Sequence, residues 1–329
     1  MLRNFRALET RCGSREPAAL IEASLAPAGT QALAEDLRLN LPEALYPLLK
    51  AQYGDELAGL AAALNAEAAV DLRVNTLRAT REEAIVALAT ENIEAQPTPL
   101  SPLGLRLKKR IALHATHAFR NGLLEPQDEG SQLLALLVNP RPGEKVCDWC
   151  AGAGGKALAL GALMKNEGEL WACDVSASRL EKLGPRAERA GLGILQAWLL
   201  RGDSPPEKSF DAVLVDAPCS ATGTWRRNPE QRLRPLDLPA LTAQQLSILQ
   251  NGAALVRSGG RLVYATCSLL AEENEQVVDR FLAAHADFSA GDAGLALSAH
   301  GIAMPGQQLR LLPHRHGTDG FFAALLNRA

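Results

Sequence analysis

The sequence has no surplus of positive charge, no long hydrophobic run and no dense set of cysteines. Its 34 Lys and Arg residues are balanced by 37 Asp and Glu residues over 329 positions, so contact with nucleic acid requires a local basic patch rather than a favourable net charge. No stretch reaches the roughly 18 apolar residues of a membrane span, and the first ten residues lack the long apolar core of a signal peptide. We therefore expect a cytoplasmic protein that does not enter a membrane.

The 6 cysteines are spread through a chain rich in helix formers, which does not indicate a secreted disulfide framework. We expect them to be reduced, and we expect Cys12, Cys147 and Cys173 to act as small buried hydrophobes. Cys147 and Cys150 have C-x-x-C spacing, but glycines intervene where a redox pair would need a helix to begin. The histidines lack convincing zinc-ligand spacing, so we predict no metal site.

The pattern of residues divides the chain into three segments. With 329 residues, of which 47% are hydrophobic, it can form a large domain with an attached module. Residues 1–65 indicate a helical segment, residues 66–122 a small α+β module that we interpret as RNA-binding, and residues 123–329 a catalytic domain.

The middle segment contains a basic strand, Leu103–Arg110, which follows a strand from Leu72 and a helix from Arg81. Two interpretations of its Lys and Arg residues remain open. They form a patch for RNA phosphates, or they line a solvated edge, because lysine commonly protects a strand edge from pairing. Under the first interpretation, we expect Arg106–Arg110 and Arg226–Arg227 to contact RNA.

From Gln127 onward, helical and strand patterns alternate, which predicts an α/β fold with a doubly wound, mostly parallel sheet. We expect strands at 145–149, 170–174 and 194–200, and two further strands that end at Asp216 and Thr266. We expect helices at 129–138, 156–165, 177–190, 241–256 and 272–285, with Gly259 and Gly260 closing the fourth.

Two of these strands are each followed closely by a cysteine. Val213–Asp216 runs through a proline to Cys219, and Leu262–Thr266 runs directly into Cys267. Chemistry in open α/β sheets gathers at the carboxyl ends of the strands. If the two strands are neighbours, at a spacing of roughly 4.8 Å, both cysteines open into one crevice. Two thiols in one site indicate covalent chemistry.

A glycine-rich turn, Asp148–Lys156, lies where the first strand of the sheet meets its helix. It matches neither a P-loop nor the dinucleotide motif, but its glycines and the helix N-terminus suit a ligand. Asp174, at the end of the next strand, can accept hydrogen bonds from ribose hydroxyls, and Asp203, after the third strand, can reach an adenine amino group. Each acid alone could instead cap a turn, yet three at successive strand ends favour a cofactor site.

These motifs resemble those of the RsmB/Sun family of RNA cytosine-5 methyltransferases. The resemblance extends from Leu72 to the C-terminus and is carried by four stretches: Asp148–Lys156, Asp216–Pro229, Tyr264–Glu275 and Arg310–Phe322. It implies a Rossmann-like class I methyltransferase fold and S-adenosylmethionine as cofactor. The implied cofactor contacts are Cys150, Ala151, Gly152, Ala153, Gly154, Gly155, Lys156, Asp174, Asp203 and Asp216. By the same resemblance, Cys267 is the nucleophile and Cys219 helps to release the product.

The chain departs from the family pattern at several places. Ala157 replaces a threonine, the segment Ser204–Ser209 is short, and Arg232 and Leu233 replace a Lys-Trp pair. Proteins of the RsmB branch begin with a large helical RNA-binding domain, and this chain has too few residues before Leu72 to form it. The last difference concerns the RNA target more than the chemistry.

The implied reaction explains the residue types. Carbon 5 of cytosine becomes nucleophilic only after a thiolate adds to carbon 6, and cysteine is both a good nucleophile and a workable leaving group. Asp216 is placed to supply or hold the ring proton, and Pro218 fixes the turn that aims Cys219. We therefore expect methylation of cytosine carbon 5 in RNA, ribosomal RNA by the resemblance, by a monomer without an obligate protein partner.

Two other functions were weighed. A DNA cytosine methyltransferase also uses a Pro-Cys nucleophile, but the added Thr-Cys motif and the basic module favour RNA. A non-catalytic RNA-binding assembly factor would keep the fold without turnover. The retention of both cysteines and three acids argues against it.

Overall fold

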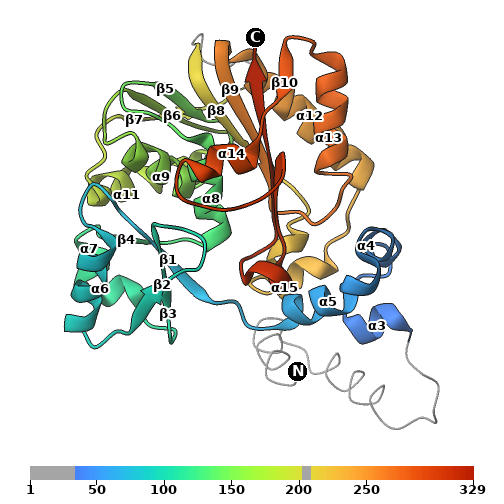
Figure 1. Cartoon of the computed structure of the whole chain (residues 1–329), viewed down its shortest axis with the longest axis horizontal. Helices are drawn as coiled ribbons and strands as arrows, with labels where there is room; N and C mark the ends of the chain where they lie inside the picture. Colours follow the sequence, from blue (N-terminus) through green and yellow to red (C-terminus); the bar gives the residue numbers. More distant parts are fainter. Residues whose placement is uncertain (1–33, 202–208) are drawn as a thin grey trace.

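The computed structural model describes residues 34–201 and 209–329 and contains two β-sheets (Figure 1). The smaller is antiparallel, with strand order β2-β3-β1-β4. Its strands are β1 (Val70–Val74), β2 (Ala95–Pro97), β3 (Gly104–Leu107) and β4 (Leu124–Pro126). Helices α6 (Arg81–Thr90) and α7 (His117–Arg120) share a small core with it. Thr80 and Glu83 form a capping box that fixes the start of α6.

The larger sheet has the order β10-β12-β9-β8-β5-β6-β7, with β11 paired to β12. Five strands are parallel: β5 (Lys145–Asp148), β6 (Glu169–Asp174), β7 (Leu195–Leu199), β8 (Phe210–Asp216) and β9 (Val256–Thr266). The antiparallel strands are β10 (Phe288–Ala290), β11 (Gln308–Leu311) and β12 (Phe321–Arg328). The predicted doubly wound, mostly parallel sheet is therefore confirmed.

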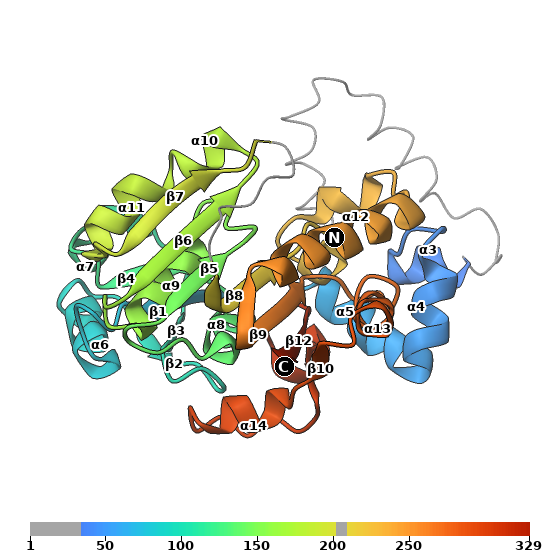
Figure 2. The same ribbon diagram turned by 90° about the horizontal axis from the view of Figure 1, so that it is seen from above.

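Helices cover both faces of this sheet (Figure 2). One face packs on α8 (Glu129–Val138), α9 (Gly155–Leu163) and α14 (Ala293–Ser298), and the other on α12 (Leu238–Ala254) and α13 (Glu275–Ala284). Successive residues of a strand point to opposite faces, so Val146 lies in the first core and Cys147 in the second. The apolar runs are continuous because both faces are buried.

Two sequence-based predictions are wrong in detail. The helix expected over 177–190 is two helices, α10 (Ala177–Leu180) and α11 (Leu183–Ala190). Pro185 has no N–H to donate to the preceding turn and is tolerated only in the first turn of a new helix. Gly259 and Gly260 do not close α12 but lie inside β9, where the register with β8 shifts.

The N-terminal helices α3 (Glu35–Leu39), α4 (Tyr46–Tyr53) and α5 (Leu57–Asn65) pack on loops of the large-sheet domain. Their leucines share a core with Trp225, Leu269 and Leu270, and α5 lies beside α15 (Pro313–His316) (Figure 1). Short 3-10 turns are η1 (Gly54–Glu56), η2 (Leu113–Ala115), η3 (Thr222–Thr224) and η4 (Pro229–Leu233). Within the described residues, no helix is long and apolar enough to cross a membrane.

Candidate active site

Strands β8 and β9 are neighbours, and the loops that follow them carry Cys219 and Cys267. The two sulfur atoms lie 3.3 Å apart, and both side chains are part-buried. The loops are joined by a hydrogen bond from Gly223 N to Cys267 O, at 2.9 Å. The two thiols therefore lie side by side at the carboxyl ends of β8 and β9, as the strand pattern predicts.

The pKa of the Cys219 thiol is raised well above its usual value. The hydrogen bond with Cys267 is the largest cause, followed by burial, and the charge of Glu273 acts in the same direction. Cys219 therefore holds its proton at neutral pH.

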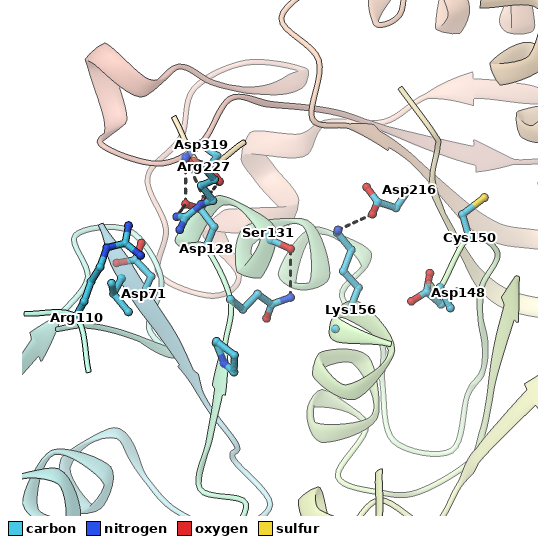
Figure 3. A pocket seen from close by; sticks show the side chains of 15 residues that line it. Asp71, Arg110, Asp128, Ser131, Asp148, Cys150, Lys156, Asp216, Arg227 and Asp319 are labelled. Atoms are coloured by element: carbon cyan, nitrogen blue, oxygen red, sulfur yellow. Dashed lines mark hydrogen bonds and ion pairs between the residues drawn. The ribbon is translucent and has the colours of Figure 1, made fainter. Parts of the chain in front are cut away.

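A part-buried cation faces the same strand end. Lys156, on the first turn of α9, donates to Asp216 at the end of β8, with Nζ and Oδ2 2.6 Å apart (Figure 3). Burial lowers the pKa of Lys156, but the Coulombic attraction and the hydrogen bond of Asp216 outweigh it and the pKa is raised. Lys156 therefore stays charged. It lies beside Asp216 and near Cys267.

Asp148, at the end of β5, lies in this group and was not among the site residues expected from sequence. Its side chain is buried, and burial raises its pKa to about 7, with Lys156 opposing and Asp216 adding to the rise. The sequence feature that could have identified Asp148 is its position as the first residue of the glycine-rich turn, directly after a buried strand.

The raised pKa of Asp148 gives a pH-dependent stability. A raised folded-state pKa means that the contribution is fully present below the usual value of 3.8 and is lost as the pH rises through about 7. At about 1.4 kcal/mol per pH unit, the loss is on the order of 4 kcal/mol. Without ligands, Asp148→Asn should therefore be more stable than wild type at pH 8, and the gap should shrink towards pH 4.

Urea denaturation at pH 4, 6 and 8 measures this difference. The exposed carboxylate of Asp55 supplies a matched control, Asp55→Asn. A gap between Asp148→Asn and wild type that stays constant from pH 4 to pH 8 would show that Asp148 does not titrate in this range.

The turn between β5 and α9 has the geometry of a ligand cradle. Gly152 and Gly154 adopt positive φ angles of 56° and 82°, and a Cβ on Gly154 would lie 2.0 Å from Leu183. The space around the Cβ position of Gly152 is open to 4 Å. Ala157, where a threonine was expected, is fully buried in an apolar cluster that suits a methyl group.

Asp174 connects this turn to the next helix. Its carboxylate accepts from Gly152 N and from Ser176 N, both at 2.8 Å. The acid at the end of β6 therefore lies beside the glycine turn, as the strand pattern predicts. Asp203 lies outside the described residues, as does Cys12.

A cavity of about 510 Å³ opens between the two sheets (Figure 3). Asp148, Lys156 and Asp216 line it from the large sheet, and Asp71 and Arg110 line it from the small sheet. Both charge signs are present, so the cavity suits a polar ligand that donates and accepts hydrogen bonds.

Arg106, Arg226 and Arg227, which the sequence suggested as RNA contacts, all bind acids of the fold. Arg106 forms two hydrogen bonds to Asp71, at 2.7 and 2.9 Å. The side chain of Arg226 is only 7% exposed, and both Arg226 and Arg227 form ion pairs with Asp128 and Asp319. Arg226 therefore connects elements of the fold, whereas Arg227 is exposed and also lines the cavity. Contact of these residues with RNA stays a prediction.

Cys147 and Cys173 are buried, as predicted for small hydrophobic residues. Cys147 and Cys173 are fully buried, with their sulfurs 3.8 Å apart, and burial raises the pKa of Cys147. Over the part of the chain that the structure describes, no group of three or more His, Cys, Asp or Glu residues could hold a metal ion.

Comparison with known families gives two matches. Residues 135–327 match the family model described as 16S rRNA methyltransferase RsmB/F, and residues 41–114 match the ferredoxin-like domain of RsmF/B-like methyltransferases. The second match includes strands β1, β2 and β3 of the small sheet together with helices α4, α5 and α6, and ends before β4.

Individual proteins agree with these matches. The chain is 36% identical to the probable ribosomal RNA small subunit methyltransferase B of Synechocystis sp., over 88% of this chain and 67% of that protein. It is also 36% identical to the Bacillus subtilis protein of the same name, over 78% of this chain and 59% of that one. The crystal structure of PH0851 superposes with a TM-score of 0.83 at 32% identity, over 91% of this chain and 70% of that one. The chain thus spans about three fifths to two thirds of the two curated relatives.

Proposed function

Because the chain belongs to the 16S rRNA methyltransferase RsmB/F family, we propose that it methylates carbon 5 of a cytosine in small-subunit ribosomal RNA, with S-adenosylmethionine as methyl donor. The observation that carries this proposal is the pair of sulfurs 3.3 Å apart at the ends of β8 and β9, beside the Lys156–Asp216 ion pair. Methylation of an amine or a hydroxyl group requires no such pair of thiols.

The turn from Cys150 to Lys156 and the acid Asp174 are the proposed binding site for the methyl donor, which supplies an electrophilic methyl group when bound. Open space beside Gly152 lets the ligand approach the backbone. Each carboxylate oxygen of Asp174 accepts one backbone N–H, so lone pairs remain for ribose hydroxyls. Asp203 completes the proposed set, in a part of the chain that the structure does not describe.

Lys156 and Asp216 are proposed to hold the base. Cytosine presents acceptors at O2 and N3, which suit an ammonium donor and a proton shared with a carboxyl group. When the Cys267 thiolate forms its bond to carbon 6, the ring electrons move towards N3, where they take a proton that the Lys156 ammonium group gives up and that Asp216 passes on. Carbon 5 is then an enamine carbon, and its electron pair takes the methyl group.

Release of the product needs the carbon 5 proton to leave. We propose that Cys219 assists this step, directly or through a water molecule, because its sulfur lies beside the sulfur that holds the base. The proton passes to a water molecule or to the Cys219 sulfur, which can ionise once Cys267 is bonded to carbon 6 and no longer raises its pKa. The electron pair left behind reforms the double bond between carbons 5 and 6, and the proton on N3 returns to the Lys156–Asp216 pair. The bond between carbon 6 and Cys267 breaks, and the thiolate leaves.

The test is methylation of small-subunit ribosomal RNA by the purified chain with labelled S-adenosylmethionine, followed by mass spectrometry of the nucleosides. The expected product is 5-methylcytidine. Methylation at another atom would reject carbon 5 while leaving the family assignment intact. Cofactor binding without methyl transfer would favour a non-catalytic assembly role.

We propose that RNA docking uses the exposed end of the basic strand. Lys108, Lys109 and Arg110 follow β3, and Lys108 and Arg110 form only exposed ion pairs, with Glu94 and Glu67. Such pairs are worth about 0–1 kcal/mol, so phosphates can replace them. This surface is more exposed than Arg106 and Arg226, two of the arginines that the sequence suggested.

Replacing Lys108, Lys109 and Arg110 together with glutamine should flatten the salt dependence of RNA binding. Each lost phosphate contact lowers the slope of log K against log salt by about one unit. Filter binding from low to high KCl measures this slope. The control is Lys145→Gln, which removes another exposed lysine that forms an ion pair, at the far end of β5. A slope equal to that of wild type would count against this surface.

A further inference from the structure

A buried carboxylate lies between the two cysteine loops. The side chain of Glu273 is completely inaccessible to solvent, and it accepts hydrogen bonds from three separate segments. Its Oε2 atom accepts from Ser220 N and from Gln245 Nε2, both at 2.8 Å. Its Oε1 atom accepts from the hydroxyl groups of Ser220 and Ser268. One side chain thus joins the loop after β8, the loop after β9 and helix α12.

The residues that bind this carboxylate are the direct neighbours of the two thiols. Ser220 follows Cys219, and Ser268 follows Cys267. Gln245 also donates to Pro218 O, at 3.0 Å, so the residue before Cys219 is held as well. The hydroxyl groups of Ser220 and Ser268 lie 3.1 Å apart. The backbone on either side of Cys219 and directly after Cys267 is therefore fixed to one anchor.

A carboxylate accepts every hydrogen bond that this set of donors offers. Four hydrogen bonds arrive at two oxygen atoms, and two of the donors, Ser220 N and Gln245 Nε2, converge on the same oxygen. A glutamine could turn its NH2 group only towards the two serine hydroxyls, which would then have to accept, and none of its contacts would be to a charged acceptor. A buried charge without a cation is costly, and no described residue forms an ion pair with Glu273. Four hydrogen bonds to the charged group offset that cost.

We propose that Glu273 is a positioning residue that sets the separation of the Cys219 and Cys267 sulfurs, and that it acts in the methylation reaction through them. The inference rests on the proposed function, because it assigns Glu273 to the same pair of thiols. The carboxylate does not touch the base. Its fixed negative charge near Cys219 also agrees with the raised pKa of that thiol.

The separation of the thiols can be measured without any catalysis. In a glutathione redox buffer, oxidised glutathione takes two electrons and two protons from the thiol pair, which gives a Cys219–Cys267 disulfide and two reduced glutathiones. The equilibrium ratio of disulfide to dithiol reports how well the folded protein holds the two sulfurs together. Mass spectrometry of peptides from acid-quenched samples gives this ratio.

Glu273→Gln should lower this equilibrium constant about tenfold or more, because hydrogen bonds to a charged acceptor are lost. It should lower kcat for methylation by a similar factor, with KM for S-adenosylmethionine little changed. The matched control is Glu144→Gln, which removes a part-buried glutamate paired with Arg261 near the other end of β9. That variant should keep the wild-type disulfide equilibrium.

Urea unfolding curves of both variants show whether each of them folds. If Glu273→Gln does not fold, the double variant Ser220→Ala and Ser268→Ala decides, because it removes two donors and leaves the carboxylate in place. A folded variant with the wild-type disulfide equilibrium would overturn the proposal. If the equilibrium falls as expected but the wild-type protein makes no 5-methylcytidine, the positioning role stands and the proposed function fails.

Discussion

Replacing Cys267 with alanine is expected to abolish methyl transfer and to leave no covalent complex with RNA. Its sulfur is the group that is proposed to bond to carbon 6, and without that bond carbon 5 stays unreactive. Cys219 is a poor substitute, because its position after Pro218 aims it from a different loop. The rate should fall by roughly a thousandfold or more, the scale seen when the nucleophile of a catalytic unit is removed.

Single-turnover methylation with labelled S-adenosylmethionine measures this loss. Calorimetry should show unchanged cofactor affinity, since Cys267 lies outside the turn that is proposed to bind it. Cys173→Ala is the matched control, because it removes a buried cysteine from β6 outside the proposed site. Activity within a few-fold of wild type in Cys267→Ala would reject Cys267 as the nucleophile.

Replacing Cys219 with alanine is expected to have the opposite signature, a stable bond between protein and RNA. Cys267 can still attack, and carbon 5 can still take the methyl group. The proton on carbon 5 then has no assisted route out, so the thiolate cannot leave and the methylated adduct accumulates. The effect is large because turnover stops after one cycle while the covalent complex builds up.

Denaturing gel electrophoresis with labelled RNA shows such a complex as a shifted band. Alanine at both positions should remove the band, since no thiol is left in the site to attack. If Cys267→Ala traps RNA and Cys219→Ala is inert, the two roles are exchanged. If neither variant loses activity, the covalent mechanism is wrong for this protein.

The strand pattern predicted the centre of the site well because its signals are local. Continuous apolar runs that end in a cysteine identify β8 and β9, and parallel topology then requires their carboxyl ends to share one edge. The glycine turn and Asp174 follow from the same reasoning. The break between α10 and α11 was also within reach, since Pro185 marks it in the sequence.

Other features depend on contacts between distant residues, and the sequence pattern is silent on these. Arg226 seemed suited to RNA until the fold placed Asp128, 98 residues away, beside it. Glu273 stood in a recognised motif without a role, because its donors come from Ser220 and Gln245, 53 and 28 residues away. The role of a charged side chain can be inferred only when its partners in the fold are known.

The packing of α4 and α5 restricts the order in which parts of the chain can fold. The hydrogen bond from the Tyr53 hydroxyl to Leu269 O spans 216 residues, and a contact so distant has a high entropic cost of loop closure and belongs to the slow part of folding. At synthesis rates of about 5–20 residues per second, these helices wait on the order of 10–40 seconds on the ribosome for their partners. Over that interval Leu49, Leu57 and Leu60, fully covered in the finished molecule, are open to chaperones. Cys267 is synthesised two residues before Leu269, so the pair of thiols cannot assemble until that interval is almost over.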